Sequence, residues 1–245
     1  MRRTETIMGM PVTLDAPGGG GDEAFEAAFA ELRRIDGLLS PFIPESAVSR
    51  IAAGTLLVRD AGPLVDEVLG LCRSFETETC GWFSAWASGR LDPCGLVKGW
   101  AIERASKILA DAGLRDHVVD GAGDVRAAGR RSKDRPWRIG IRRPWRRDTV
   151  VAVIAGSDLA VATSGTYEKG AHVLDPHTRA GATELVSVTV VGTDLTTADA
   201  YATAVLAAGW RGLGIVERAR GYEALAIDAE ERMLATSGLE PWLVA

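Results

Sequence analysis

The sequence predicts an α+β protein whose core is a mainly antiparallel sheet with flanking helices. Helical patterns gather in the first half of the chain, whereas short β-like segments bounded by Gly, Pro or charged residues dominate the second half. These segments lack the regular strand–helix–strand order of a doubly wound fold. The chain has 245 residues, 47% hydrophobic and 25% charged, which is enough for a compact core. We expect one domain over residues 1–245, with two lobes as an alternative.

One strand and four helices are expected in the first half. Residues 5–17 predict a strand that ends in the glycine loop 18–21. Helices are predicted over residues 22–40, 44–51, 63–79 and 96–113. The first and last of them carry a clear apolar stripe, Pro63 starts the third, and Gly113 stops the fourth.

The second half is expected to form strands, one long helix and a final hairpin. Strands are predicted over residues 117–129, 137–143, 149–156, 159–165 and 184–192. Residues 195–210 are rich in alanine and resemble a buried helix. Residues 222–238 contain two short β segments around an acidic turn, which indicates a hairpin.

Composition argues against several classes of protein. The net charge of −5 disfavours general nucleic-acid binding, and no run of eighteen apolar residues predicts a membrane-spanning helix. The N-terminal residues lack the apolar segment and cleavage site of a secretory signal, so we expect a cytoplasmic protein. The three cysteines are too few for a disulfide framework and are not spaced as zinc ligands, so we expect them to be reduced.

The charge is nevertheless uneven along the chain. Residues 130–147 carry nine Lys or Arg residues against one acidic residue. A solvated hairpin with charges on its outer face is the favoured interpretation. The alternative is a site for a phosphate-bearing ligand or an acidic partner.

The alanine-rich helix 195–210 starts with an unusual group of oxygen-bearing side chains. Thr196 or Thr197 fits an N-cap, and Asp199 suits the positive end of the helix dipole. Neither role explains Thr203, a polar β-branched residue one turn further on. Because residues i and i+4 share a helix side, Asp199 and Thr203 present a carboxylate and a hydroxyl together, which are oxygen ligands of the kind that Mg²⁺ uses.

A second segment has the character of an anion site. In residues 91–105 an Asp-Pro turn leads through Gly95 into a helix whose first N–H groups are free, and Lys98 adds a cation there. An ordinary loop-to-helix junction is the alternative. The segment is not a Walker motif, and residues 120–124, "DGAGD", do not match GxGxxG.

Taken in order, six segments resemble the motifs of the ApbE-type FAD:protein FMN transferases. Those patterns are M-G-T, D-P-x-G-x-x-K-G-[YW], N-A-G-G-D, A-T-S-G, H-x-[IV]-D-P-x-T-G and T-A-D-A-x-[AD]-T. Their counterparts here are "MGM" (8–10), "DPCGLVKGW" (92–100), "DGAGD" (120–124), "ATSG" (162–165), "HVLDPHTRAG" (172–181) and "TADAYATA" (197–204). The resemblance implies an ApbE-like architecture related to the T-fold.

The resemblance also implies an activity and a set of ligands. Similar enzymes bind FAD and, with Mg²⁺, transfer its FMN half through a phosphoester bond to a Thr or Ser of an acceptor protein, releasing AMP. The acceptor carries a motif resembling D-x-x-[ST]-G-A-T, which this chain lacks. The implied Mg²⁺ ligands are the side chains of Asp199 and Thr203 and the carbonyl of Gly95. The implied flavin-site residues are Met8, Phe42, Asp92, Lys98 and the main chain near Leu174.

Transfer to a hydroxyl calls for a nearby base. His172 and Asp175 are the candidates by their chemistry, and a purely structural histidine is the alternative. The chain departs from the family pattern at Met10, Asp120 and Arg179, and Ser84 stands where relatives commonly carry Asp. Two other functions therefore stay open: hydrolysis of FAD to FMN and AMP, and flavin binding without catalysis. Monomer and homodimer are both compatible with the sequence.

Overall fold

The computed structural model describes residues 1–166, 170 and 173–244. Its centre is an eight-stranded antiparallel sheet with the strand order β1-β2-β3-β4-β7-β8-β9-β10, and a second sheet has the order β11-β6-β5. The strands of the large sheet are β1 (Arg2–Ile7), β2 (Met10–Asp15), β3 (His117–Gly121), β4 (Asp124–Ala128), β7 (Leu159–Gly165), β8 (Ser187–Gly192), β9 (Glu223–Ile227) and β10 (Met233–Ala235). The small sheet consists of β5 (Trp137–Arg143), β6 (Arg146–Gly156) and β11 (Leu243–Val244).

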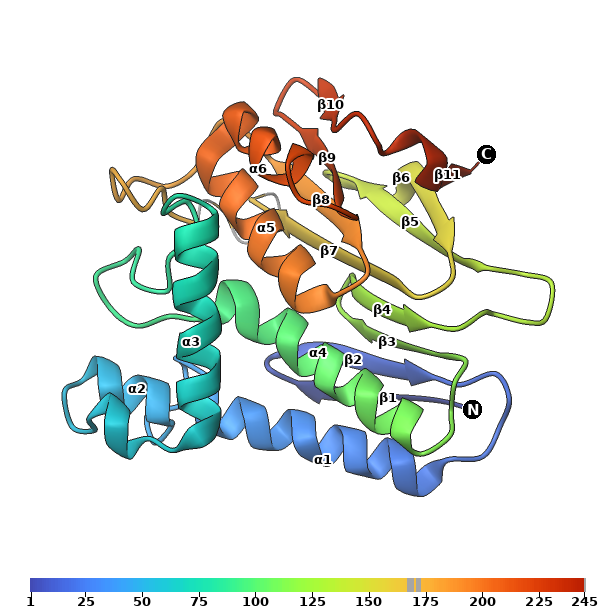
Figure 1. The fold of residues 1–245 in the computed structure, drawn as a ribbon, viewed down its shortest axis with the longest axis horizontal. Coiled ribbons are helices and arrows are strands. Elements are labelled where there is room, and N and C mark those ends of the chain that lie inside the picture. Colours follow the sequence, from blue (N-terminus) through green and yellow to red (C-terminus); the bar gives the residue numbers. More distant parts are fainter. Residues whose placement is uncertain (167–169, 171–172, 245) are drawn as a thin grey trace.

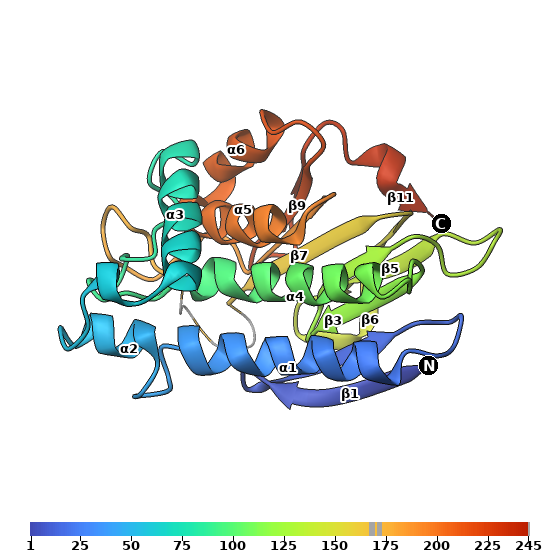
Figure 2. The ribbon, with the colours of Figure 1, turned by 60° about the horizontal axis from the view of Figure 1, so that its bottom comes forward.

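The helices lie together on one face of the large sheet (Figures 1 and 2). The α-helices are α1 (Asp22–Leu39), α2 (Ala47–Ala52), α3 (Pro63–Glu78), α4 (Cys94–Asp111), α5 (Leu195–Ala208) and α6 (Leu213–Glu217). Three 3-10 turns accompany them: η1 (Val58–Asp60), η2 (Gly209–Gly212) and η3 (Glu240–Trp242). The predicted α+β class with an antiparallel sheet and flanking helices is therefore confirmed.

Alternating side chains divide the large sheet between two cores. In β7, Ala160 and Ala162 belong to the core under the helices, whereas Leu159 and Val161 belong to the core under the small sheet. This is the two-residue period of a strand that is buried on both faces. The large sheet is therefore the middle of three layers.

Helix α5 is buried on nearly all sides, as its uniformly apolar sequence requires. Its N-cap is Asp194, whose carboxylate accepts a hydrogen bond from the Thr197 N–H over 2.9 Å. The predicted cap at Thr196 or Thr197 is wrong by two or three residues. With Asp194 as the N-cap, Asp199 lies beyond the first turn of the helix, and its carboxyl group is buried.

The predicted single strand over residues 5–17 is also wrong. The backbone turns at Met8 and Gly9, whose φ angles are 55° and 70°, and β1 and β2 pair as a hairpin around them. Two successive residues with positive φ are typical of a type I′ hairpin turn, in which a methionine is uncommon. This choice of residue explains why the turn is hard to recognise from the sequence.

Two further expectations concern membranes and thiols. No described helix is both long and apolar enough to cross a membrane. The cytoplasmic location stays a prediction. Cys72, Cys80 and Cys94 are not joined by disulfides, and Cys72 is buried whereas Cys80 and Cys94 are exposed.

Candidate functional site

The candidate site lies at a close contact between α4 and α5. A Cβ atom on Gly95 would lie 2.9 Å from Thr203 Oγ1, and one on Gly99 would lie 2.5 Å from the Leu195 carbonyl oxygen and 2.7 Å from Asp199 Cβ. Gly95 and Gly99 are one turn apart on α4, as Asp199 and Thr203 are on α5. The two glycines therefore allow the two helices to bring these polar groups into contact.

Asp199 receives a hydrogen bond from the facing helix. The Gly99 N–H donates to Asp199 Oδ2 over 2.8 Å, in a buried position. Burial raises the pKa of Asp199 to about 8, and the negative charge of Asp124 adds to the effect, whereas Lys98 and the Gly99 N–H oppose it. A carboxylate in this position favours the approach of a further positive charge.

Thr203 completes the group of oxygen atoms. Its hydroxyl donates to the Gly95 carbonyl over 3.4 Å and lies 3.3 Å from the Ser164 hydroxyl at the end of β7. The two predicted side-chain ligands and the predicted carbonyl ligand are thus neighbours in the fold. Whether they bind a metal stays a prediction.

Lys98 is held by an acidic residue that the sequence reasoning did not single out. Its ammonium forms an ion pair with Asp124, whose other oxygen accepts the Thr163 N–H over 2.9 Å. Asp124 Oδ2 has no hydrogen-bond partner in the described part of the chain, so the nearby Lys98 is the charge that compensates it. Burial lowers the pKa of Lys98, but Asp124 and Asp199 outweigh it and leave the pKa raised.

The donor set fits Mg²⁺ better than a softer metal. Carboxylate, hydroxyl and carbonyl oxygens are the ligands of hard cations, and Mg²⁺ commonly takes one or two carboxylates together with phosphate oxygens. Within the described ranges, no three His, Cys, Asp or Glu side chains are grouped as a metal site. A Zn²⁺ site of nitrogen and sulfur ligands is therefore not what these residues form.

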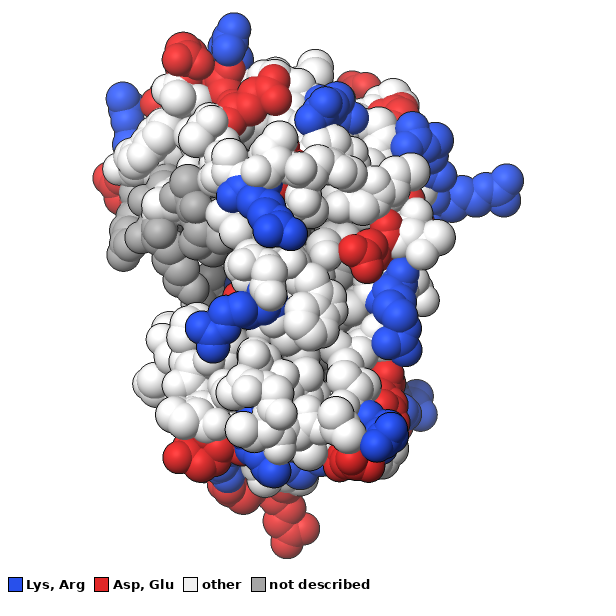
Figure 3. Space-filling model, turned by 90° about the vertical axis from the view of Figure 1, so that its left-hand side faces the viewer, with Lys and Arg blue, Asp and Glu red and all other residues white. Residues whose placement is uncertain are grey.

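Three other predicted residues lie in loops or turns. The Asp92 carboxylate accepts the Cys94 N–H over 3.0 Å and so caps the start of α4. The Met8 N–H donates to Asp36 Oδ2 over 3.0 Å, which anchors the β1–β2 turn to α1. Phe42 is 84% exposed, so its ring is available to an aromatic ligand. Figure 3 shows the side of the molecule from which α4 begins, where the described surface is mainly uncharged.

Leu174 and Asp175 belong to a short paired segment. Leu174 pairs with Gly181, and Asp175 Oδ1 accepts the His177 N–H over 2.8 Å. Burial raises the pKa of Asp175, but this hydrogen bond and those from Thr178 outweigh it, so the pKa is lowered and the carboxylate is a weak base. The other candidate base, His172, lies outside the described residues.

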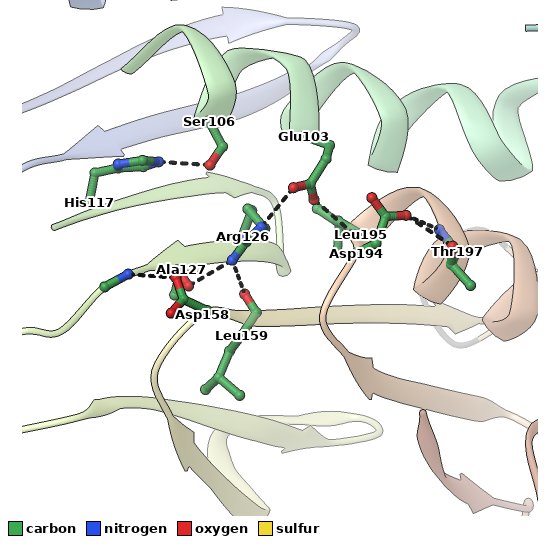
Figure 4. A network of polar contacts seen from close by, with 11 residues as sticks. Glu103, Ser106, His117, Arg126, Ala127, Asp158, Leu159, Asp194, Leu195 and Thr197 are labelled. Atoms are coloured by element: carbon green, nitrogen blue, oxygen red, sulfur yellow. Dashed lines mark hydrogen bonds and ion pairs between the residues drawn. The ribbon is translucent and has the colours of Figure 1, made fainter. Parts of the chain in front are cut away.

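A half-buried ion pair holds α4, β4 and the start of α5 together (Figure 4). Glu103 Oε1 accepts from Arg126 over 2.8 Å, and its Oε2 accepts the Leu195 N–H over 2.9 Å. Arg126 also donates to the Ala127 and Leu159 carbonyl oxygens. The start of α5, and with it the position of Asp199, is thereby tied to α4.

Comparison with known proteins identifies the family. A family model described as the ApbE family matches residues 86–226, which is more than half of the chain. The chain belongs to the ApbE family. The resemblance predicted from the six motifs is therefore confirmed.

Curated members of the ApbE family include similar sequences. The FAD:protein FMN transferase of Vibrio cholerae is 29% identical over 62% of this chain and 50% of its own length. That of Rhodobacter capsulatus is 36% identical over 49% of this chain and 24% of its own length. The chain thus spans half or less of these relatives.

Solved ApbE structures share the fold. The flavin transferase ApbE from Vibrio cholerae has a TM-score of 0.87 with 20% identity, covering 99% of each chain. The ApbE protein from Thermotoga maritima has a TM-score of 0.86 with 22% identity, covering 100% of this chain and 99% of its own. The three-layer arrangement is therefore that of ApbE proteins.

The departures from the ApbE motifs fall largely on turns. The Asp120 carboxylate accepts the Gly123 N–H over 2.8 Å, so it stabilises the β3–β4 turn, although its charge also acts on Lys98. Ala122 and Arg179 stand at positions where the motifs have Gly, and their φ angles are 54° and 62°. Both turns keep the left-handed backbone that glycine adopts at lowest cost.

Proposed function

We propose that the protein transfers FMN from FAD to a Thr or Ser of an acceptor protein, with Mg²⁺, and releases AMP. Membership of the ApbE family and relatives named FAD:protein FMN transferase support this activity. The observation that carries the proposal is the convergence of Asp199, Thr203 and the Gly95 carbonyl at the α4–α5 contact. These groups suit a magnesium ion that also binds the diphosphate of a dinucleotide.

The proposed FAD site extends from this contact over the start of α4. Lys98 and the positive end of the α4 dipole supply positive potential for the diphosphate. Asp92 holds the first turn of α4 in place through its bond to the Cys94 N–H. Met8, Phe42 and the main chain at Leu174 are the proposed contacts of the flavin.

The reaction is a phosphoryl transfer. The acceptor hydroxyl oxygen forms a bond to the phosphorus of the FMN half, and the bond from that phosphorus to the bridging oxygen breaks, so that AMP leaves with the bridging oxygen. A bound Mg²⁺ would neutralise negative charge on the diphosphate oxygens. Lys98 contributes a further positive charge near the same oxygens, and Asp199 and Thr203 keep the ligand oxygens in position.

The acceptor hydroxyl also loses a proton, which passes to a base or to water. His172 and Asp175 stay the proposed bases. Hydrogen bonds from His177 and Thr178 lower the pKa of Asp175 and make its carboxylate a weaker base. His172 is therefore the better candidate of the two. The partner is a protein with a motif resembling D-x-x-[ST]-G-A-T.

The test uses the purified protein, FAD, MgCl₂ and a peptide that carries the acceptor motif. We expect the peptide to gain the mass of FMN in a phosphoester and one AMP to appear for each modified peptide. A peptide with Ala in place of the acceptor hydroxyl is the control and should remain unmodified. AMP release at equal rates with either peptide would instead identify an FAD hydrolase. FAD binding with no AMP release would identify a flavin-binding protein without catalysis.

A further inference from the structure

Residues 173–182 form a small hairpin with its own hydrogen bonds. The Ala182 N–H donates to the Val173 carbonyl over 2.9 Å, and the Asp175 N–H donates to the Ala180 carbonyl over 2.8 Å. The Asp175 carboxylate closes the tip by accepting the His177 N–H. His177 therefore stands at the exposed end of a hydrogen-bonded element that also carries Leu174.

The tip of this hairpin rests on a tryptophan from a distant part of the chain. The rings of Trp82 and His177 have their centroids 4.4 Å apart at 75°, an edge-to-face arrangement. The Arg211 guanidinium carbon lies 4.2 Å from the centroid of the same Trp82 ring. An aromatic edge contact and a cation over a ring are both attractive arrangements.

The backbone next to Trp82 is adapted to this contact. Gly81 has a φ angle of 82°, and a Cβ atom there would lie 3.2 Å from His177 Cε1. A side chain at position 81 would therefore be strained in its backbone and would press on the histidine ring. The glycine keeps the approach to the ring of His177 open.

Three segments meet at this point. Trp82 belongs to the loop between α3 and α4, His177 to the hairpin 173–182, and Arg211 to η2, which follows α5 (Figure 1). Shortly after the hairpin 173–182, the Glu184 carboxylate packs against Gly209 at the start of η2, in the space that a Cβ atom on Gly209 would fill. These contacts hold the hairpin 173–182 near the C-terminal end of α5, the helix that carries Thr203.

We propose that Trp82 is a positioning residue that fixes the hairpin 173–182 relative to α5. This proposal rests on the proposed function, in which Leu174 contacts the flavin and Asp175 lies beside the reacting hydroxyl. Trp82 acts on Leu174 and Asp175 through His177, whose ring it contacts. Loss of the ring leaves the hairpin folded but free to move away from α5.

Hydrogen–deuterium exchange of the whole protein tests this directly. In Trp82→Leu and in His177→Ala, exchange of the amides in residues 173–182 is expected to rise about tenfold, equivalent to about 1.4 kcal/mol of local opening free energy, while exchange in α5 stays unchanged. Trp82→Phe retains a ring and should restore most of the protection. Trp86→Leu is the matched control, because Trp86 lies in the same loop and is 47% exposed. Unchanged exchange in both Trp82→Leu and His177→Ala would overturn the proposal, as would an equal rise in Trp86→Leu.

Transfer kinetics provide the second readout. We expect Trp82→Leu to lower kcat about tenfold with a smaller change in the Kd for FAD, because the contact at Leu174 is loosened while the diphosphate contacts at α4 and α5 persist. An equal loss in Trp86→Leu would contradict a specific positioning role. If the wild-type protein transfers no FMN, the proposed function fails, whereas the exchange measurement still decides whether Trp82 holds the hairpin.

Discussion

The backbone N–H of Gly99 donates a hydrogen bond to Asp199 Oδ2 over 2.8 Å, which joins the second turn of α4 to a buried carboxyl group of α5. Such a bond requires the two helix axes to be unusually close. Glycine at position 99 permits this, since its Cα faces the Leu195 carbonyl without an intervening side chain. The geometry of the candidate site therefore depends on a residue that contributes no side-chain chemistry.

Gly99→Ala should destabilise the fold and impair the site. The new methyl group would lie 2.5 Å from the Leu195 carbonyl oxygen, so α4 and α5 have to separate. We expect a loss of about 1–3 kcal/mol of unfolding free energy, measured by urea denaturation. Gly70→Ala in the middle of α3 is the control, because the nearest atom to its Cβ would be a flexible arginine end at 3.9 Å. That control should stabilise the protein by about 0.5–1 kcal/mol, and a loss of stability there as large as in Gly99→Ala would refute the explanation.

Asp199→Asn should abolish magnesium-dependent turnover without unfolding the protein. Asn still accepts the Gly99 N–H and resembles the protonated carboxyl group that the raised pKa of Asp199 favours without Mg²⁺, so the unfolding free energy without Mg²⁺ should be unchanged or higher. The rate at limiting Mg²⁺ should fall about 100-fold or more, since a charged ligand supplies several kcal/mol. Asp111→Asn, an exposed acid at the other end of α4 paired with Lys107, is the control and should leave the rate unaltered. Wild-type activity of Asp199→Asn at limiting Mg²⁺ would exclude the metal role.

Particular residues show what the sequence could predict about this site and what it could not. Asp199 and Thr203 are separated by one helical turn, so their common direction follows from helix geometry alone. Their position opposite Gly95 and Gly99 is a tertiary contact over about a hundred positions of sequence, and no local pattern encodes it. The family motifs were the only signal that related the two helices.

The elements of the fold likewise differ in how well the sequence predicts them. Helices with a strong apolar stripe, such as α1, begin and end near the predicted residues. The β1–β2 turn was missed because Met8 takes a left-handed conformation that its residue type does not indicate. Asp124 was missed because its importance arises from burial beside Lys98, although its position at the end of "DGAGD" was a signal that could have identified it.

Lys98→Ala should weaken FAD binding by about tenfold or more, because a cation near the diphosphate is lost. The variant also leaves the buried Asp124 carboxylate without its ion pair, which should cost about 3 kcal/mol of unfolding free energy. The double variant Lys98→Met with Asp124→Asn separates the two effects. It should regain most of the stability but not the affinity, as measured by thermal unfolding and by quenching of flavin fluorescence. Recovery of FAD affinity in the double variant, or an unaltered Kd in Lys98→Ala, would count against a role of Lys98 in binding.

His117 should make the stability of the protein depend on pH. It is fully buried between α4 and the sheet, with its ring nitrogens 2.6 Å from the Leu114 carbonyl and 2.7 Å from the Ser106 hydroxyl. Burial lowers its pKa below the usual value of about 6.5, even though the bond to the Leu114 carbonyl opposes the shift.

In the window below pH 6.5, the unfolded chain binds a proton that the folded chain does not bind at this histidine. The contribution of His117 to stability is therefore complete above about pH 6.5 and is lost as the pH falls toward its folded pKa, at up to about 1.4 kcal/mol per pH unit. His117→Gln should lower stability at pH 7.5 yet flatten the decline between pH 6.5 and 5, as measured by urea denaturation at each pH. A decline of the same steepness in His117→Gln would assign the decline to other titrating groups and exclude His117 as its cause.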